Sequence, residues 1–362
     1  MWFYFGHQGY EYVDLGRVWQ IGLFVGLLLW LFLVTRSILP AFKKPGEHKH
    51  LLALFLVSTT AIGLFYGAGL SWGRQTHLSI VEYWRWWVIH LWVEGFFEVF
   101  ATVVIAFFFT KLNLIKARFA AQAALLSATV YLSGGIIGTL HHLYFSGTPT
   151  VALAWGSVFS ALEVVPLLLI AYASWDDYRL AKSNDWVKNY RWPIYYFLSV
   201  AFWNMLGAGL FGFMINPPIA LYYMQGLNTT PVHAHAALFG VYGMLGIGLM
   251  LFCLKAMNPT LQWNDRALKF SFWSINIGLM AMIFLSLLPV GLLQTWASVE
   301  HGYWYARSGE FLKTPLMQTL RWLRVPGDTI FALGALVLTW FVFSVSTKLF
   351  RQSSPVVIRK GE

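Results

Sequence analysis

Five of the ten histidines fall at the ends of long apolar runs, where their side chains could bind a metal. His90 lies near the start of one run, His141 and His142 close another, and His233 and His235 open a third. Polar side chains within a membrane are costly and by default functional. Imidazole is the commonest neutral metal ligand. Because the chain has one cysteine, these histidines predict an iron or copper site.

The spacing of the histidines divides them between sites. At about 100° per residue, His233 and His235 project roughly 200° apart on a helix, so their helix must separate two sites, as it would between two haems. The neighbours His141 and His142 diverge by about 100° and converge on one ion only where the helix is distorted or ends. The following LYFSGTP provides such an end. His90 would complete a three-histidine site.

Three glutamates accompany the histidines within apolar runs. Glu94 follows His90 by four residues, so it stands one helical turn further on the same face. Glu98 is one turn beyond, and Glu163 lies in the middle of a later run. A hard oxygen ligand beside three histidines favours iron over copper, so Glu94 is a candidate iron ligand. Glu98 and Glu163 are candidate proton carriers; a neutral, hydrogen-bonded carboxylic acid is the alternative for each.

The elements that carry these residues are apolar segments long enough to cross a bilayer. The chain is 58% hydrophobic and 11% charged, which excludes a soluble enzyme. About 20 apolar residues span the membrane as a helix. Nine such runs are predicted at 18–38, 51–70, 86–110, 120–140, 152–173, 193–213, 233–254, 268–292 and 326–348. We expect an all-α integral membrane protein with one domain over residues 1–362.

Lysine and arginine predict the orientation of these spans. One set of connections holds 18 of the 25 basic residues, and cytoplasmic loops carry such an excess. The N-terminus is therefore expected in the periplasm and the C-terminus in the cytoplasm, in the inner membrane of a bacterium. The net charge of +10 is explained by topology, so no nucleic-acid partner is predicted.

Three stretches resemble one family of respiratory enzymes. HLWVEGFFEVF, GGIIGTLHHLYFSGTP and HAHAALFGVYGMLG are together similar to the catalytic subunit of the haem–copper oxidase superfamily. The segment HLWVEGFFE lacks the Pro and Tyr of the oxidase motif, which is the nitric oxide reductase pattern. The opening WFYFGHQGYEYVDLGRVWQ and the segment RWLRVPGDTIF resemble the quinol-dependent branch. The implied fold is the twelve-helix bundle of the family's catalytic subunit.

This resemblance implies a ligand for each metal. Non-haem iron would be held by His90, His141, His142 and Glu94. The proximal ligand of a high-spin haem b would be His233, and His235 would be one axial ligand of a low-spin haem b. Glu98 and Glu163 would match buried glutamates near the two irons.

Two further acidic residues are implied more remotely. Glu11 would match a calcium ligand near the haem propionates, with a solvated loop residue as the alternative. Asp328 would fall near the propionates and the quinol site, with an N-cap of the ninth span as the alternative.

The implied reaction joins two nitric oxide molecules, two protons and two electrons into N₂O and water. A membrane quinol would be the donor, and the lipid bilayer the surrounding medium. The alternatives are a terminal oxidase that reduces O₂ with copper, and a non-catalytic membrane remnant or proton-relaying transporter.

The resemblance also leaves parts unmatched. Nine predicted spans correspond to helices four to twelve of the bundle, and a second axial histidine for the low-spin haem is expected from an earlier helix. We expect a partial sequence, or a split or decayed gene with a separately encoded N-terminal half. This chain alone is expected not to catalyse quinol-driven reduction of nitric oxide.

Overall fold

A computed structural model describes residues 1–10, 12–43, 46, 49–111, 116–162 and 189–353, without the side chains of Glu94 and residues 349–353. The first half contains α1 (Trp2–Phe5), α2 (Arg17–Phe42), α3 (Lys49–Phe65), η1 (Tyr66–Leu70), α4 (Leu78–Trp86), η2 (Trp87–Phe96), α5 (Phe97–Lys111), α6 (Ala117–Gly138), η3 (Thr139–His142) and α7 (Thr150–Leu162). The second half contains α10 (Arg191–Trp203), η4 (Asn204–Phe211), α11 (Gly212–Ile215), α12 (Ala220–Met224), α13 (Thr229–Ala234), η5 (His235–Gly243), α14 (Met244–Met257), α15 (Asp265–Ala281), η6 (Met282–Leu287), α16 (Leu288–His301), α17 (Tyr303–Ala306), α18 (Gly309–Leu312), α19 (Pro315–Trp322) and α20 (Arg324–Ser353).

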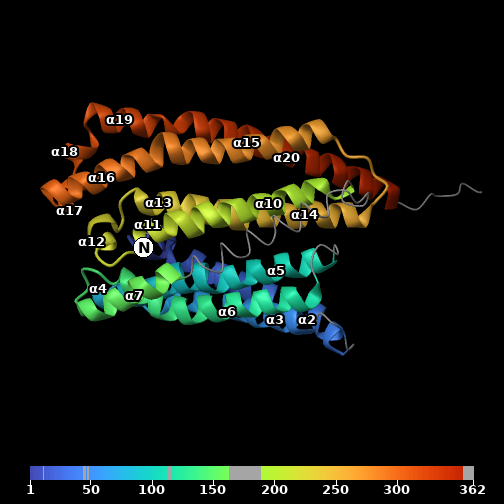
Figure 1. Cartoon of the computed structure of the whole chain (residues 1–362), viewed down its shortest axis with the longest axis horizontal. Helices are drawn as coiled ribbons and strands as arrows, with labels where there is room; N and C mark the ends of the chain where they lie inside the picture. The colour runs from blue at the N-terminus through green and yellow to red at the C-terminus, as the bar shows by residue number, and fades with distance from the viewer. Residues whose placement is uncertain (11, 44–45, 47–48, 112–115, 163–188, 354–362) are drawn as a thin grey trace, which may run out of the picture.

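Long helices run side by side along the longest axis of the molecule (Figure 1). The pair α15 and α20 forms one side, α10 and α14 lie in the middle, and α2, α3, α5 and α6 form the other side. Within the described residues, eight continuous helical stretches are long and apolar enough to cross a membrane. They match eight of the nine predicted spans. The remaining prediction, 152–173, is described only as far as α7, and its second half lies outside the described residues.

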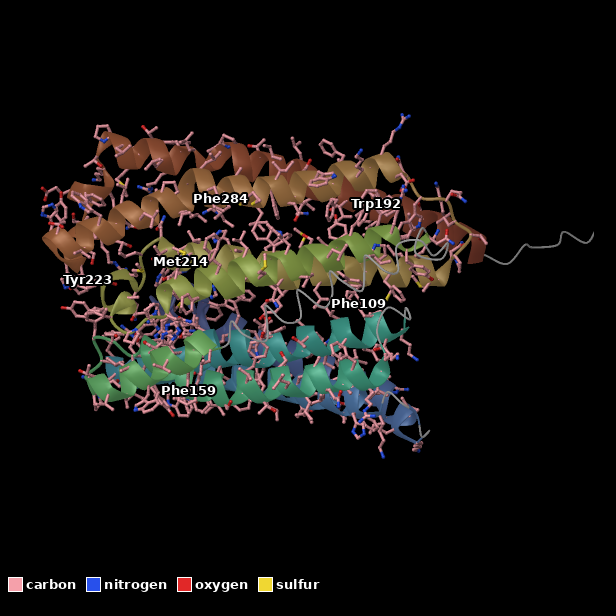
Figure 2. The ribbon with its side chains drawn as sticks, in the orientation of Figure 1. Phe109, Phe159, Trp192, Met214, Tyr223 and Phe284 are labelled. Carbon is pink, nitrogen blue, oxygen red and sulfur yellow. The ribbon has the colours of Figure 1, made fainter. Side chains whose placement is uncertain are left out.

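The outer surface of the bundle fits a bilayer. Large apolar side chains such as Trp296, Leu336 and Phe343 are more than half exposed on the long helices. Figure 2 shows apolar side chains, Phe284 among them, along the length of the bundle. A contiguous apolar exterior of this kind marks a membrane-embedded surface. The chain is therefore an all-α integral membrane protein, as predicted.

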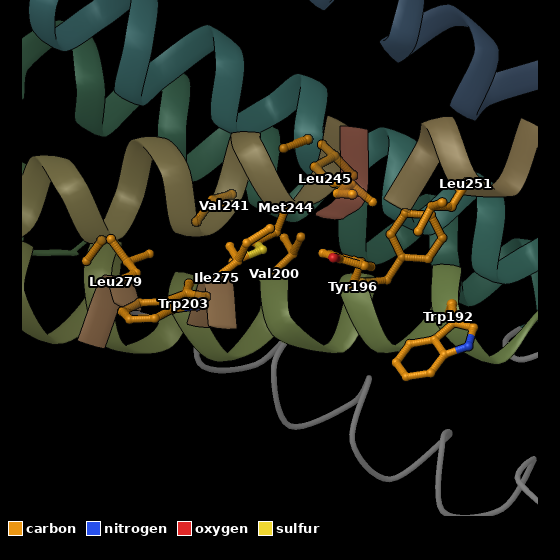
Figure 3. Packing of buried hydrophobic residues seen from close by; sticks show 14 of the residues in the cluster. Trp192, Tyr196, Val200, Trp203, Val241, Met244, Leu245, Leu251, Ile275 and Leu279 are labelled. Carbon is orange, nitrogen blue, oxygen red and sulfur yellow. The ribbon is translucent and has the colours of Figure 1, made fainter. Parts of the chain in front are cut away.

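The main core fills the space between the central helices and α15. Trp203, Tyr196 and Met244 are fully buried there, and Ile275 and Leu279 of α15 pack against the same cluster (Figure 3). Two interhelical hydrogen bonds accompany this packing: Trp203 Nε1 and Ser199 Oγ both donate to Asn276 Oδ1, over 2.9 and 2.6 Å. This core fixes the helix that carries His233 and His235 relative to its neighbours.

Four stretches of the described spans, η2, η4, η5 and η6, form wider π-helical turns. Wide turns of this kind are rare and frequently occur at functional sites. The periodicity of the sequence predicted a plain α-helix around His90, whereas His90 lies inside the π-helical η2. The wider turn changes which side chains of this helix share a face.

Candidate metal centre and adjoining cavity

Three of the predicted ligands meet at one end of the bundle. His90 on η2 and His141 and His142 on η3 are all buried, and one ring nitrogen from each lies within 4.8 Å of the others. His142 Nε2 and His90 Nδ1 are 3.1 Å apart and hydrogen bonded. An ion with bonds of about 2.1 Å at tetrahedral angles would hold its nitrogens about 3.4 Å apart. The three rings are therefore close to the spacing that one shared ion requires.

The adjacent pair converges because its helix ends there. α6 stops at Gly138, and the four residues Thr139–His142 form a tighter 3₁₀ turn before the chain leaves the helix. The two imidazole centroids are 4.0 Å apart. This confirms the prediction that His141 and His142 face one centre only where the helix ends.

Glycines allow the close approach of the elements that carry the rings. A Cβ atom at Gly156 of α7 would lie far inside van der Waals distance of the His141 backbone nitrogen. A Cβ at Gly138 would come within 3.0 Å of His90 Nε2. Only a residue without a side chain lets α7 pack directly on the turn that holds the histidine pair.

A cavity of about 380 Å³ adjoins the cluster. His142, Trp86 and His233 all line it. Most of the remaining wall is apolar, with Val93, Ala237 and Leu238 among its residues. The volume falls in the range of about 300–1,000 Å³ that ligand pockets occupy.

His233 and His235 face different sides of their helix, as predicted. His233 Nδ1 lies 2.9 Å from the Gly207 carbonyl oxygen of η4. A carbonyl only accepts, so Nδ1–H donates and the lone pair stands on Nε2. A ligand histidine of a metal is usually oriented in this way. His235 Nδ1 donates to the Pro231 carbonyl over 2.9 Å.

His235 belongs to a polar group outside the cavity. Its Nε2 lies 3.0 Å from Arg324 Nη2 of α20, so it accepts from the guanidinium. Arg324 Nε in turn donates to the Asp328 carboxylate over 3.1 and 3.2 Å. α20 begins at Arg324, so Asp328 lies inside the helix and is not its N-cap. The N-cap alternative for Asp328 is therefore wrong.

Glu98 on α5 is buried and lines the cavity. The Tyr242 hydroxyl lies 3.1 Å from Glu98 Oε2 and 2.8 Å from the Val93 carbonyl oxygen. The hydroxyl has one proton and the carbonyl can only accept. Both hydrogen bonds form together when Glu98 is protonated, because the acid then donates to Tyr242 and Tyr242 donates to Val93.

Three of the predicted site residues lie beyond what the structure describes. Glu11 and Glu163 are outside the described residues, and the backbone of Glu94 lies in η2 while its side chain is outside them. The structure therefore brings together His90, His141 and His142 and puts Glu98 and His233 on the adjoining cavity.

Three neighbours of the site were not among the residues that the sequence suggested. Trp86 stacks on His142, Tyr242 reaches Glu98, and Arg324 contacts His235. A weak signal existed for two of them. Trp86 precedes His90 by four residues, and Arg324 precedes Asp328 by four, so each shares a helix face with a candidate residue.

Comparison with known proteins assigns this chain to a family. The family model described as "Cytochrome C and Quinol oxidase polypeptide I" matches residues 1–330. The chain belongs to this family. It is also 27% identical over 359 residues to a nitric oxide reductase subunit from Stutzerimonas stutzeri, a match that covers 97% of this chain and 71% of that protein.

Polypeptides I of this family bind haem and are multi-pass membrane proteins. The residues around the cavity fit such a group. His233, with its Nδ1–H fixed by a carbonyl, lines a mostly apolar cavity of about 380 Å³ that His142 of the three-histidine cluster also lines. This donor set consists of nitrogen ligands suited to iron or copper.

Proposed function

We propose that this chain is the catalytic core of a nitric oxide reductase, which combines two nitric oxide molecules into N₂O at a pair of irons. The observation that carries the proposal is that His142 of the three-histidine cluster and His233 line one cavity. Two metal sites on one largely apolar cavity suit a reaction that must bring two small molecules together.

The proposed ligands divide between the two sides of this cavity. His90, His141 and His142 would hold a non-haem iron together with Glu94, and His233 would bind a high-spin haem b through Nε2. When bound, these two irons supply redox electrons and polarise the substrate. The balanced reaction takes two NO, two protons and two electrons to one N₂O and one water.

The chain's own residues provide an apolar cavity wall and a source of protons. The cavity wall is mostly apolar, and an apolar setting strengthens electrostatic interactions inside. Glu98 would hold a proton at its Oε2, with its hydroxyl aimed at Tyr242, and release it toward the cavity that it lines. Glu163 is proposed as a second proton carrier because it lies in the middle of an apolar run of the sequence.

The other side of the His233 helix is proposed to serve electron entry. His235 would be one axial ligand of a low-spin haem b, and Arg324 must then leave His235 Nε2, where it now donates. A membrane quinol is the proposed donor. Glu11 is proposed as a calcium ligand, and Asp328 as a residue near the haem propionates and the quinol.

The orientation of the protein is also a proposal. The N-terminal α1 and the end of α20 lie at opposite ends of the bundle (Figure 1), and Tyr12, Val13 and Leu15 line the same cavity as His142. The basic residues support a cytoplasmic C-terminus. We therefore propose that the cavity opens near the periplasmic face of a bacterial inner membrane, in one domain over residues 1–362.

Metal and haem content of the purified chain tests this proposal. The wild-type protein is expected to contain b-type haem, to hold non-haem iron rather than copper, and to convert NO to N₂O when a reduced artificial donor replaces quinol. His142→Ala should keep haem and lose the non-haem iron. Copper in place of this iron, with consumption of O₂ and not NO, would favour the terminal oxidase; absence of haem and metal would overturn both.

A further inference from the structure

An indole ring lies flat against one ring of the three-histidine cluster. Trp86, the last residue of α4, is parallel to His142 within 4°, and the two ring centroids are 3.8 Å apart. Both side chains are buried. Aromatic pairs ordinarily prefer offset or edge-to-face arrangements at about 4.5–7 Å, because two negative ring faces repel. A parallel contact this close is most favourable when one of the two rings is electron-poor.

Trp86 is itself fixed on several sides. Its Nε1–H donates to Glu82 Oε2 over 3.3 Å, one helical turn earlier. Arg85 donates to the same carboxylate oxygen over 2.6 Å, and its guanidinium lies 5.1 Å from the Trp86 ring centroid. Leu143 and Leu153 pack with Trp86 in one buried cluster. The indole therefore has little freedom to turn away from His142.

We propose that Trp86 is a positioning residue for the metal centre: it holds the His142 ring in its ligating orientation and favours the metal-bound form of that ring. This inference rests on the proposed function, since it assumes that the cluster binds a metal ion.

The physical reason is the charge on the imidazole. A metal ion withdraws electrons from the ring that binds it, and an electron-poor ring is attracted by the negative face of tryptophan, the best of the aromatic side chains for this interaction. The stack therefore stabilises bound over unbound His142. It also restricts the rotation of His142 about its side-chain bonds before the metal binds. Less conformational entropy is therefore lost on binding.

Cobalt binding to the purified, metal-depleted full chain tests the proposal. Co²⁺ serves as the probe because its visible absorption reports the number and geometry of its ligands. We expect Trp86→Leu to weaken Co²⁺ affinity about 10-fold, as loss of outer contacts to metal ligands commonly does, and to shift the visible bands. Trp86→Phe keeps a flat ring but loses the bond to Glu82, so its affinity should fall between wild type and Trp86→Leu.

Trp192 provides the matched control. It is buried in the main core, its Nε1–H donates to the Asp265 carboxylate over 2.8 Å, and the Arg191 guanidinium lies 5.5 Å from its ring centroid, as at Trp86. Trp192→Leu should leave both the Co²⁺ affinity and the spectrum at wild-type values. If a change appeared equally in Trp192→Leu, the effect would reflect general loosening of the bundle and the role of Trp86 would be refuted.

The remaining outcomes separate the two proposals. Equal affinity and spectra in wild type, Trp86→Leu and Trp86→Phe would overturn the role of Trp86 while the metal centre stood. No Co²⁺ binding by the wild type, or binding unchanged in His142→Ala, would overturn the metal centre and the role of Trp86 with it. If Trp86→Leu does not fold, Trp86→Phe is compared with Trp192→Phe. Weaker Co²⁺ binding by Trp86→Phe alone would support the role of Trp86, and equal binding by both would refute it.

Discussion

The two histidine sites on either side of the His233 helix differ in how firmly their surroundings are built. Around His142, the stacked Trp86 and the Glu82–Arg85 ion pair are nearly fully buried, with side-chain exposures of 11% and 7% for the pair. Around His235, the ion pair of Asp328 and Arg324 is 46% and 36% exposed. The same residue type thus has a rigid, dry setting on one side and a half-exposed one on the other.

This difference indicates which histidine the fold holds in a fixed orientation and which one has neighbours that can move. Buried, hydrogen-bonded surroundings hold a ligand ring before a metal arrives. A half-exposed guanidinium on His235 Nε2 can move aside at modest cost, because exposed ion pairs contribute about 0–1 kcal/mol. Variants on each side, taken from the largest expected effect to the smallest, test whether the contrast is real.

The largest effect is expected from Glu82→Gln. This change removes the carboxylate charge that lies 2.6 Å from the buried Arg85 guanidinium, and loss of one partner of a buried ion pair costs roughly 3–5 kcal/mol. Reversible unfolding in mixed micelles, followed by tryptophan fluorescence, measures the loss. A cost below about 1 kcal/mol, the range of an exposed pair, would mean that the His142 side is no more firmly built than the His235 side.

The next largest effect, a loss of metal affinity, is expected from His142→Ala. Loss of a ligand should lower metal affinity by more than the roughly 10–100-fold that loss of an outer contact causes. His235→Ala is the control, because His235 contacts Pro231 and Arg324. Metal analysis of both variants should show non-haem iron lost from the first and kept by the second. Equal loss from both would contradict the division into two sites.

Gly156→Ala should destabilise the turn that holds His141 and His142 while every candidate ligand side chain is kept. The new methyl would overlap the backbone at Leu140 and His141, and overpacking of this kind typically costs about 1–3 kcal/mol. Gly22→Ala on α2 meets nothing within 4 Å and should be neutral or slightly stabilising, since alanine favours helix. Thermal unfolding of the two variants in the same detergent compares them; identical midpoints would count against close packing of α7 on the turn.

The smallest effect is expected from Asp328→Asn. It removes one charge of the half-exposed pair with Arg324, so the free energy of unfolding should change by less than about 1 kcal/mol, and by less still in high salt. Unfolding midpoints at low and high ionic strength give the comparison with Glu82→Gln. A cost of several kcal/mol would show that the His235 side is also rigid.

Local features of the chain were predictable. Hydropathy located eight described spans, because membrane insertion depends on the apolar content of each segment by itself. Helical geometry separated His233 from His235, and the end of α6 brought His141 and His142 together, since both follow from neighbouring residues alone. The site residues of greatest interest were therefore visible from type and spacing.

Contacts between distant segments were decided only in three dimensions. The Tyr242–Glu98 bond joins residues 144 apart, and the Arg324–His235 bond joins residues 89 apart. The stack of Trp86 on His142 depends on how α4 and η3 meet across the bundle. Sequence periodicity states which face a side chain occupies, but the partner on that face depends on helix packing and on the π-helical turns that change its register. The composition of the chain determined that it spans a membrane and which residue types can bind a metal. The packing of the helices determined which side chains contact those residues.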